Sequence, residues 1–154
     1  MEKEILNGYL NDAHFRERYP GAHGKWMEAA SLLWGANPET ELTTIGHKTR
    51  EAVQEFATTL AERDGLQDTI PNPAHTVARL RAVIEHHRNR LGEARQGLLD
   101  DLVLGEVNDL LQRQEHGGQK EGDPLSWEDG RRAVFQSAIV MYEIDRTLAS
   151  SAES

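Results

Sequence analysis

The chain has 154 residues and a mass of 17.3 kDa, which is the usual size of one globular domain. Its 26 Asp and Glu residues outweigh 17 Lys and Arg residues, for a net charge of −9. This charge argues against a protein held on nucleic acid by bulk charge, and no DNA footprint is expected, because phosphate binding requires a basic surface. The absence of cysteine excludes disulfides, thiolate zinc sites and thiol nucleophiles.

The N-terminal half predicts three helices separated by turn residues. A short helix is indicated near the N-terminus by Ile5, Leu6, Tyr9 and Leu10. A second helix ends at Gly35 and carries Trp26, Met27, Ala30, Leu33 and Trp34. The third spans residues 43–63, with apolar residues at helical spacing: Ile45, Ala52, Val53, Phe56 and Leu60.

The next segment gives the clearest helical period. Steps of three and four residues separate Val77, Leu80, Ile84, His87, Leu91, Ala94 and Leu98, which predicts one amphipathic helix over residues 76–98. Asn72 and Pro73 suit the N-cap and the first helical position. A further apolar stripe over residues 98–111 predicts that a helix continues after a bend near Gly97.

The last predicted helix begins at a capping box. Ser126 is followed three residues later by Asp129, the arrangement in which each residue satisfies the other's backbone N–H. The run 133–144 is nearly all apolar, so we expect this helix to lie in the middle of a bundle. Aspartate in place of Phe135 or Ile139 is therefore expected to unfold the protein.

These elements together predict an all-α protein, a single antiparallel bundle of five to six helices. We expect one domain over residues 1–149, followed by a polar tail, residues 150–154, that frays. No apolar stretch approaches the roughly 20 residues that span a bilayer, and the first residues lack the pattern of a signal peptide. A cytoplasmic protein with no membrane partner is expected.

The histidines do not form a recognisable metal motif, although there are seven of them. No Glu-x-x-His pair occurs, and the adjacent His86 and His87 point about 100° apart on a helix. We expect no metal and no other cofactor. His87 occupies a position in the apolar stripe, which favours a histidine at the edge of the core with one ring nitrogen hydrogen-bonded.

A carboxylate pair suggests one enzymatic alternative. Glu106 and Asp109 are three residues apart on one helix face, as in the second acidic pair of MazG-like and dUTPase-like nucleotide pyrophosphohydrolases, which bind Mg²⁺. The nearest candidates for the first pair, Glu51 and Glu55, are four apart. A solvated helix face is the favoured interpretation of Glu106 and Asp109.

A basic segment stands out in this acidic chain. Residues 76–96 carry five arginines against two glutamates: Arg79, Arg81, Arg88, Arg90 and Arg95. Such a segment is suited to contact RNA phosphates or a protein partner. Pairing with acidic neighbours is the favoured alternative, since Glu85 lies one helical turn from both Arg81 and Arg88.

Two Arg/His pairs are candidates for catalysis. Arg113 and His116 are about 60° apart around a helix, so they would converge beside the glycine-containing loop 117–125. Arg81 and His86 form the alternative pair and are roughly 140° apart, so they converge less well.

The segment 106–148 resembles the C-terminal part of bacterial HEPN-like helical proteins. The resemblance lies in a helix that carries Arg113 and His116, a short loop, and an acid-led last helix. It implies a role in abortive infection, toxin–antitoxin or other defence systems, and a homodimer that can bind an antitoxin or another defence component. Members that are nucleases cut RNA without metal through Arg and His, which hold phosphate charge and transfer protons.

This resemblance leaves two functions open. Arg113 and His116 are closer together than in the family's motif, and Ala82 follows Arg81 where a polar residue is usual. The first possibility is a non-enzymatic or degenerate module that binds protein or RNA in a defence or stress system. The alternative is a metal-independent ribonuclease.

Overall fold

The computed structural model describes residues 13–66, 68, 72, 75–110 and 126–153, and this part of the chain is helical with no strand. The predicted all-α class is confirmed. The elements are α2 (Ala13–Arg18), α3 (Pro20–Leu33), the 3-10 helix η1 (Pro38–Glu41), α4 (Leu42–Arg63), α5 (Thr76–His86), α6 (Arg88–Asp101), the π-helix η2 (Leu102–Val107) and α8 (Trp127–Glu153).

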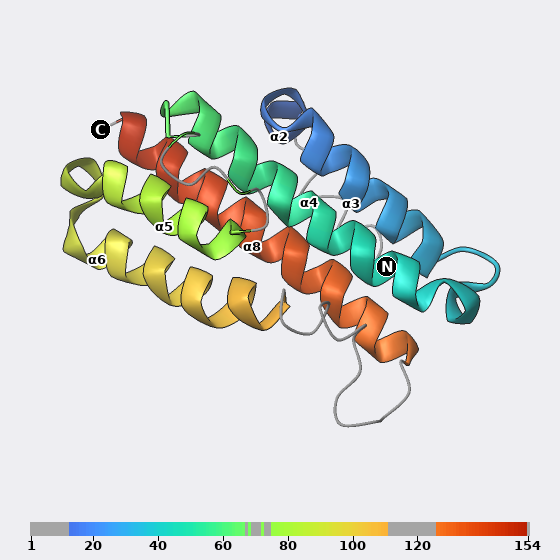
Figure 1. Ribbon diagram of the computed structural model, residues 1–154. Helices are drawn as coiled ribbons and strands as arrows, with labels where there is room; N and C mark the ends of the chain where they lie inside the picture. The colour runs from blue at the N-terminus through green and yellow to red at the C-terminus, as the bar shows by residue number, and fades with distance from the viewer. Residues whose placement is uncertain (1–12, 67, 69–71, 73–74, 111–125, 154) are drawn as a thin grey trace.

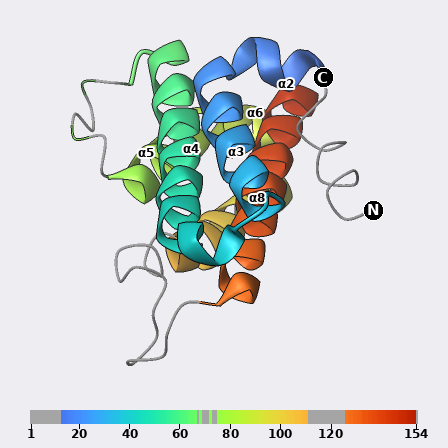
Figure 2. The ribbon, with the colours of Figure 1, turned by 90° about the vertical axis from the view of Figure 1, so that its right-hand side faces the viewer.

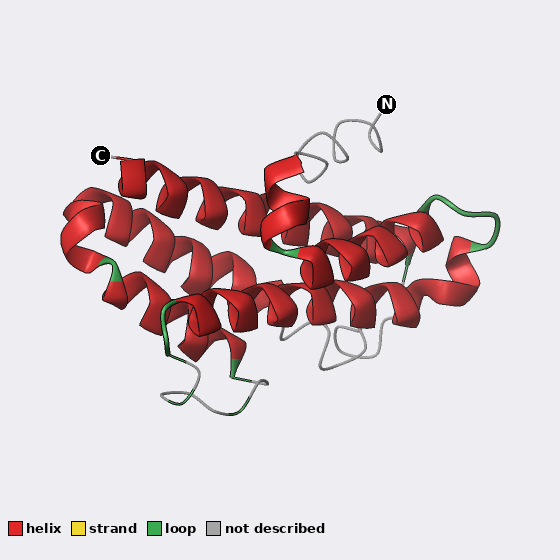
Figure 3. Ribbon diagram, turned by 90° about the horizontal axis from the view of Figure 1, so that it is seen from above, coloured by secondary structure: helices red, strands yellow, loops and turns green. Residues whose placement is uncertain are grey.

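The long helices lie side by side in an elongated bundle (Figure 1). α4 packs against α3, α5 and α8, while α6 packs against α5 and α8. Viewed from above, α2 lies across the end of α3 (Figure 3). None of the described helices is both long and apolar enough to cross a membrane.

The predicted helices at residues 26–34 and 43–63 are confirmed as α3 and α4. α3 begins at Pro20, where the fixed φ of proline favours the first helical turn, and ends just before Gly35. Its inward face includes Trp26, whose indole Nε1–H donates to the Val134 carbonyl of α8 at 3.0 Å. The helix predicted from Ile5, Leu6, Tyr9 and Leu10 lies outside the described residues.

The single helix predicted over residues 76–98 is instead divided between α5 and α6, with a further break inside α6, so this part of the prediction is wrong. The helical path breaks at His87 and again at Gly92, whose φ of 80° is readily adopted only by glycine. The expected bend at Gly97 does not occur, because that residue continues α6. The helix also begins later than expected, at Thr76 after His75 rather than after Asn72.

The capping box at the start of α8 is confirmed. The Ser126 backbone N–H donates to the Asp129 carboxylate at 2.9 Å, and the Asp129 backbone N–H donates to Ser126 Oγ at 3.3 Å. From this start, α8 continues through Glu153, into the segment 150–154 that was expected to be a polar tail.

α8 packs against α3, α4, α6 and η2, and none of the described helices packs on its remaining face. Ile139 is 39% exposed, so an aspartate there would reach water, whereas Phe135 is partly buried against the core. The premise of this prediction, an apolar run buried on all sides, does not hold at Ile139, and the effect of the two substitutions stays a prediction. The core positions are the neighbouring Val140 and Met141, which are 1% and 0% exposed.

Candidate functional site

The corner between α5 and α6 is built around His87. This residue ends α5 by donating its backbone N–H to the Val83 and Ile84 carbonyls, at 3.2 and 3.1 Å. It also begins α6, because its carbonyl accepts the N–H groups of Arg90 and Leu91. Its backbone therefore joins two helices, and its side chain is held at the same point.

The His87 ring is bonded at both nitrogens. Arg90 Nη2 lies 2.6 Å from Nδ1, and because a guanidinium can only donate, Nδ1 must be the acceptor. The proton of the neutral ring is then on Nε2, which donates to Asp64 Oδ2 at 2.9 Å. The predicted core-edge histidine is confirmed, with the second nitrogen also engaged. His87 thus connects the end of α4 to the α5–α6 corner and has no ring nitrogen left for catalysis.

The basic residues around this corner are largely on the surface. The side chains of Arg81, Arg88, Arg90 and Arg95 are exposed, as is His86, whose ring meets the His87 ring edge-on with centroids 5.0 Å apart. Arg88 pairs with Glu85 at 3.1 Å. No carboxylate pairs with Arg81 or Arg95 within the part of the chain that the structure describes.

Arg79 does not belong to this surface. It is 5% exposed, and its Nη1 donates to Thr58 Oγ1 of α4 at 2.8 Å. This placement does not favour the predicted role of Arg79 in binding RNA or a partner. The residue lies between buried Thr76, Leu80 and Val83, on the inward arc of α5. The guanidinium serves the α4–α5 contact instead.

The two predicted catalytic pairs have different outcomes. Arg113 and His116 lie outside the described residues, so their arrangement remains a prediction. Arg81 and His86 are both exposed on α5, and no bond between them occurs in the described structure. His86 is the exposed ring of the corner, beside the arginines of α6, so any acid–base role there would fall to it.

Glu106 and Asp109, the acidic pair that suggested a pyrophosphohydrolase, both accept hydrogen bonds from the side-chain amide of Gln136. Gln136 Nε2 of α8 donates to Glu106 Oε2 at 2.7 Å and approaches Asp109 Oδ2 at 3.4 Å. This contact connects η2 to α8 across the bundle. Glu51 instead pairs with Lys25 at 3.0 Å. Among the described residues, no three His, Asp or Glu side chains are placed to hold a metal ion.

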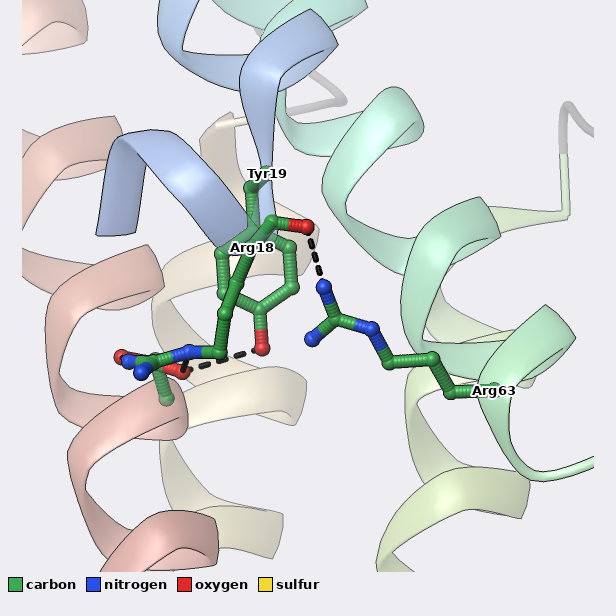
Figure 4. A network of polar contacts seen from close by, with 4 residues as sticks. Arg18, Tyr19 and Arg63 are labelled. Atoms are coloured by element: carbon green, nitrogen blue, oxygen red, sulfur yellow. Dashed lines mark hydrogen bonds and ion pairs between the residues drawn. The ribbon is translucent and has the colours of Figure 1, made fainter. Parts of the chain in front are cut away.

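A second polar cluster was not anticipated from the sequence (Figure 4). Asp145 of α8 is 4% exposed and accepts hydrogen bonds from Arg18 Nε at 3.2 Å, from Arg18 Nη2 and from the Tyr19 hydroxyl at 2.9 Å. Arg63 of α4 donates to the Arg18 carbonyl. The Arg63 guanidinium also lies 4.6 Å from the centre of the Tyr19 ring, a cation–π contact.

This cluster fastens the junction of α2 and α3 to α4 and α8. Burial, together with the charge of Asp145, raises the pKa of the Tyr19 hydroxyl well above its ordinary value, so it remains a hydrogen-bond donor. The only signal in the sequence was an aspartate between Met141, Ile144 and Leu148, on the inward side of an apolar helix. A charge at such a position requires a partner, but the sequence does not say which one.

Comparison with known proteins does not extend this description: no family model, no curated protein and no solved structure matches the chain.

Proposed function

We propose that the protein is a non-enzymatic module that binds RNA through the α5–α6 corner. The observation that carries the proposal is the set of exposed arginines Arg81, Arg88, Arg90 and Arg95 in a chain of net charge −9. An acidic surface elsewhere repels phosphate, so a local basic patch would also orient the RNA.

The contacts of the individual arginines support RNA over internal pairing. Arg81 and Arg95 have no carboxylate partner in the described part of the chain, and Arg88 shares only an exposed ion pair with Glu85. Exposed pairs of this kind stabilise by ~0–1 kcal/mol, so Arg88 can exchange Glu85 for a phosphate at little cost. Following the resemblance of residues 106–148 to HEPN-like proteins, we place this module in a bacterial defence or stress system.

Binding to a labelled single-stranded RNA, measured by fluorescence anisotropy at several salt concentrations, tests the proposal. The double variant Arg81→Gln/Arg95→Gln should bind about tenfold more weakly. It should also show a slope of log K against log salt shallower by about 1.4, for two lost phosphate contacts. The control Arg16→Gln/Lys25→Gln removes the same charge from α2 and α3 and should bind like the wild type. Equal losses in both variants would contradict a specific site.

The ribonuclease alternative is tested in the same samples. Incubation with EDTA should leave the RNA intact, because the proposed module binds RNA without cleaving it. Cleavage by the wild type that is lost in His116→Ala or Arg113→Ala would instead establish the metal-independent nuclease. Loss in His86→Ala alone would place the catalysis at the α5–α6 corner. Removal of an acid–base group typically costs ~100- to 10,000-fold in rate, so the distinction is large.

A further inference from the structure

The open face of α8 carries an ordered stripe of six residues. Steps of four and three residues separate Glu128, Arg132, Phe135, Ile139, Tyr142 and Arg146. At 3.6 residues per turn these positions fall within about 80° around the helix. The stripe is apolar at its centre and charged at both ends, and this spacing is that of a helix seam that packs on another helix.

No described helix packs over the outer side of this stripe. α3 and α6 pack on either side of α8, and in Figure 2 no described helix lies beyond its outer side. Ile139 is 39% exposed, and the Glu128 side chain is 66% exposed. Phe135 and Tyr142 are partly buried against the core, and the Arg131 guanidinium lies 4.5 Å from the Phe135 ring centre. An exposed isoleucine beside an aromatic ring forms an apolar surface, and its burial against a partner would be favourable.

We infer that the occupant of this face is a second copy of α8, packed antiparallel. In that orientation, Phe135 of one copy lies opposite Ile139 of the other. The same register sets Arg132 opposite Tyr142 and Glu128 opposite Arg146. The two-fold axis repeats each pair, so the interface has an apolar centre, two cation–π contacts and two ion pairs at its ends.

The charges decide the orientation. A parallel, in-register pair of α8 helices would set Glu128 against Glu128, Arg132 against Arg132 and Arg146 against Arg146. Like charges in direct opposition destabilise an association, whereas the antiparallel register brings opposite charges together. The net charge of −9 does not oppose this contact locally, because the stripe contains two arginines and one glutamate.

The length of the stripe indicates how tightly the proposed dimer should associate. From Glu128 to Arg146 the helix advances about 27 Å at 1.5 Å per residue. A contact along one helix pair is at the small end of stable interfaces, so we expect a dimer with a dissociation constant in the micromolar range. Sedimentation velocity between roughly 1 and 200 µM, without RNA, measures it directly. A protein that remains a monomer throughout overturns the inference and leaves the face to a different partner.

Ile139→Asp should abolish dimerisation while the monomer stays folded, because position 139 reaches solvent. Leu98→Asp is the matched control: it places the same charge at an exposed apolar residue of α6, 53% exposed and outside the stripe, and should leave the dimer intact. Thermal unfolding of both variants checks that each is folded. A dimer that survives Ile139→Asp overturns the proposed interface.

A charge exchange tests the antiparallel register itself. Glu128→Arg or Arg146→Glu alone should weaken the dimer by about tenfold or more, because each sets like charges together at both ends. Combining Glu128→Arg with Arg146→Glu restores opposite charges and should return the dissociation constant to within about threefold of the wild type. A double variant as weak as the single ones overturns this register.

Discussion

A single carboxylate, Asp145, holds several parts of the molecule together. Arg18 and Tyr19 are neighbours in sequence, and both donate to this one residue, which lies 126 or 127 positions further along the chain. Asp145 is buried, whereas the Arg18 side chain is 34% exposed. The partly solvated arginine neutralises the buried charge without being fully desolvated itself, which limits the cost of the pair.

Asp145→Asn should therefore destabilise the protein by about 2 kcal/mol, because it removes the negative charge to which Arg18 and Tyr19 both donate hydrogen bonds. Tyr19→Phe loses only one hydrogen bond and should cost about 1 kcal/mol. Urea unfolding measures both values, and Glu143→Gln on the same helix serves as the control for removal of a carboxylate. If Asp145→Asn were as stable as the control, the network would make no net contribution.

At the scale of elements, the sequence predicted those helices that have a regular apolar period or a clear capping motif. α4 follows from a regular apolar period, and α8 follows from its capping box. The break within residues 86–92 could not be predicted in the same way, because Arg88, Arg90 and Leu91 are good helix formers. Gly92 and Gly97 look equivalent in the sequence, which does not indicate that Gly92 is the one that leaves the helix.

The two glycines should consequently respond in opposite directions to alanine. Gly92 has φ 80°, so Gly92→Ala should destabilise the fold by ~1 kcal/mol even though there is space for a methyl group. Gly97 lies inside α6 with equal space, so Gly97→Ala should stabilise by up to ~1 kcal/mol. Thermal or urea unfolding of the two variants gives the signs, and a stabilising Gly92→Ala would be inconsistent with the observed break.

The candidate site could be predicted in part, for similar reasons. His87 was expected at the edge of the core because it interrupts an apolar stripe. Arg79 was grouped with the exposed arginines because the segment was interpreted by its net charge, whereas its phase relative to Leu80 and Val83 already indicated the buried arc. Asp64 could not be identified from the sequence, since it meets His87 only through the packing of α4 on α5.

At the scale of the whole molecule, the proposed RNA surface and the proposed dimer face are separate. Figure 2 shows α5 and the outer side of α8 on opposite sides of the bundle. A dimer formed through α8 would leave both α5–α6 corners facing outwards. Two corners that engage one RNA would raise the apparent affinity without any new contact, provided that the RNA can span the distance between them.

The stability of the whole molecule should depend on pH through His23. Burial, and then the positive charge of Arg16, lower the pKa of His23 below its ordinary value of 6.5. The unfolded chain then binds the proton more readily than the folded one, so stability falls as the pH drops below about 6.5. His23→Gln should lose less stability between pH 7 and 5 than the wild type does. His86→Gln, at an exposed ring, is the control, and parallel pH profiles for wild type and His23→Gln would refute this assignment.

The intrinsic fluorescence of the tryptophans is expected to be sensitive to one part of the bundle and insensitive to another. Trp26 donates to Val134 of α8, Trp127 donates to Leu33 of α3 at 3.3 Å, and Trp34 stands at the end of α3. The chain has no other tryptophan. Intrinsic fluorescence therefore follows the separation of α3 from α8, whereas melting of α5 and α6 alone would change only the circular dichroism. Coincidence of the two signals during unfolding would show that both halves of the bundle melt as one cooperative unit.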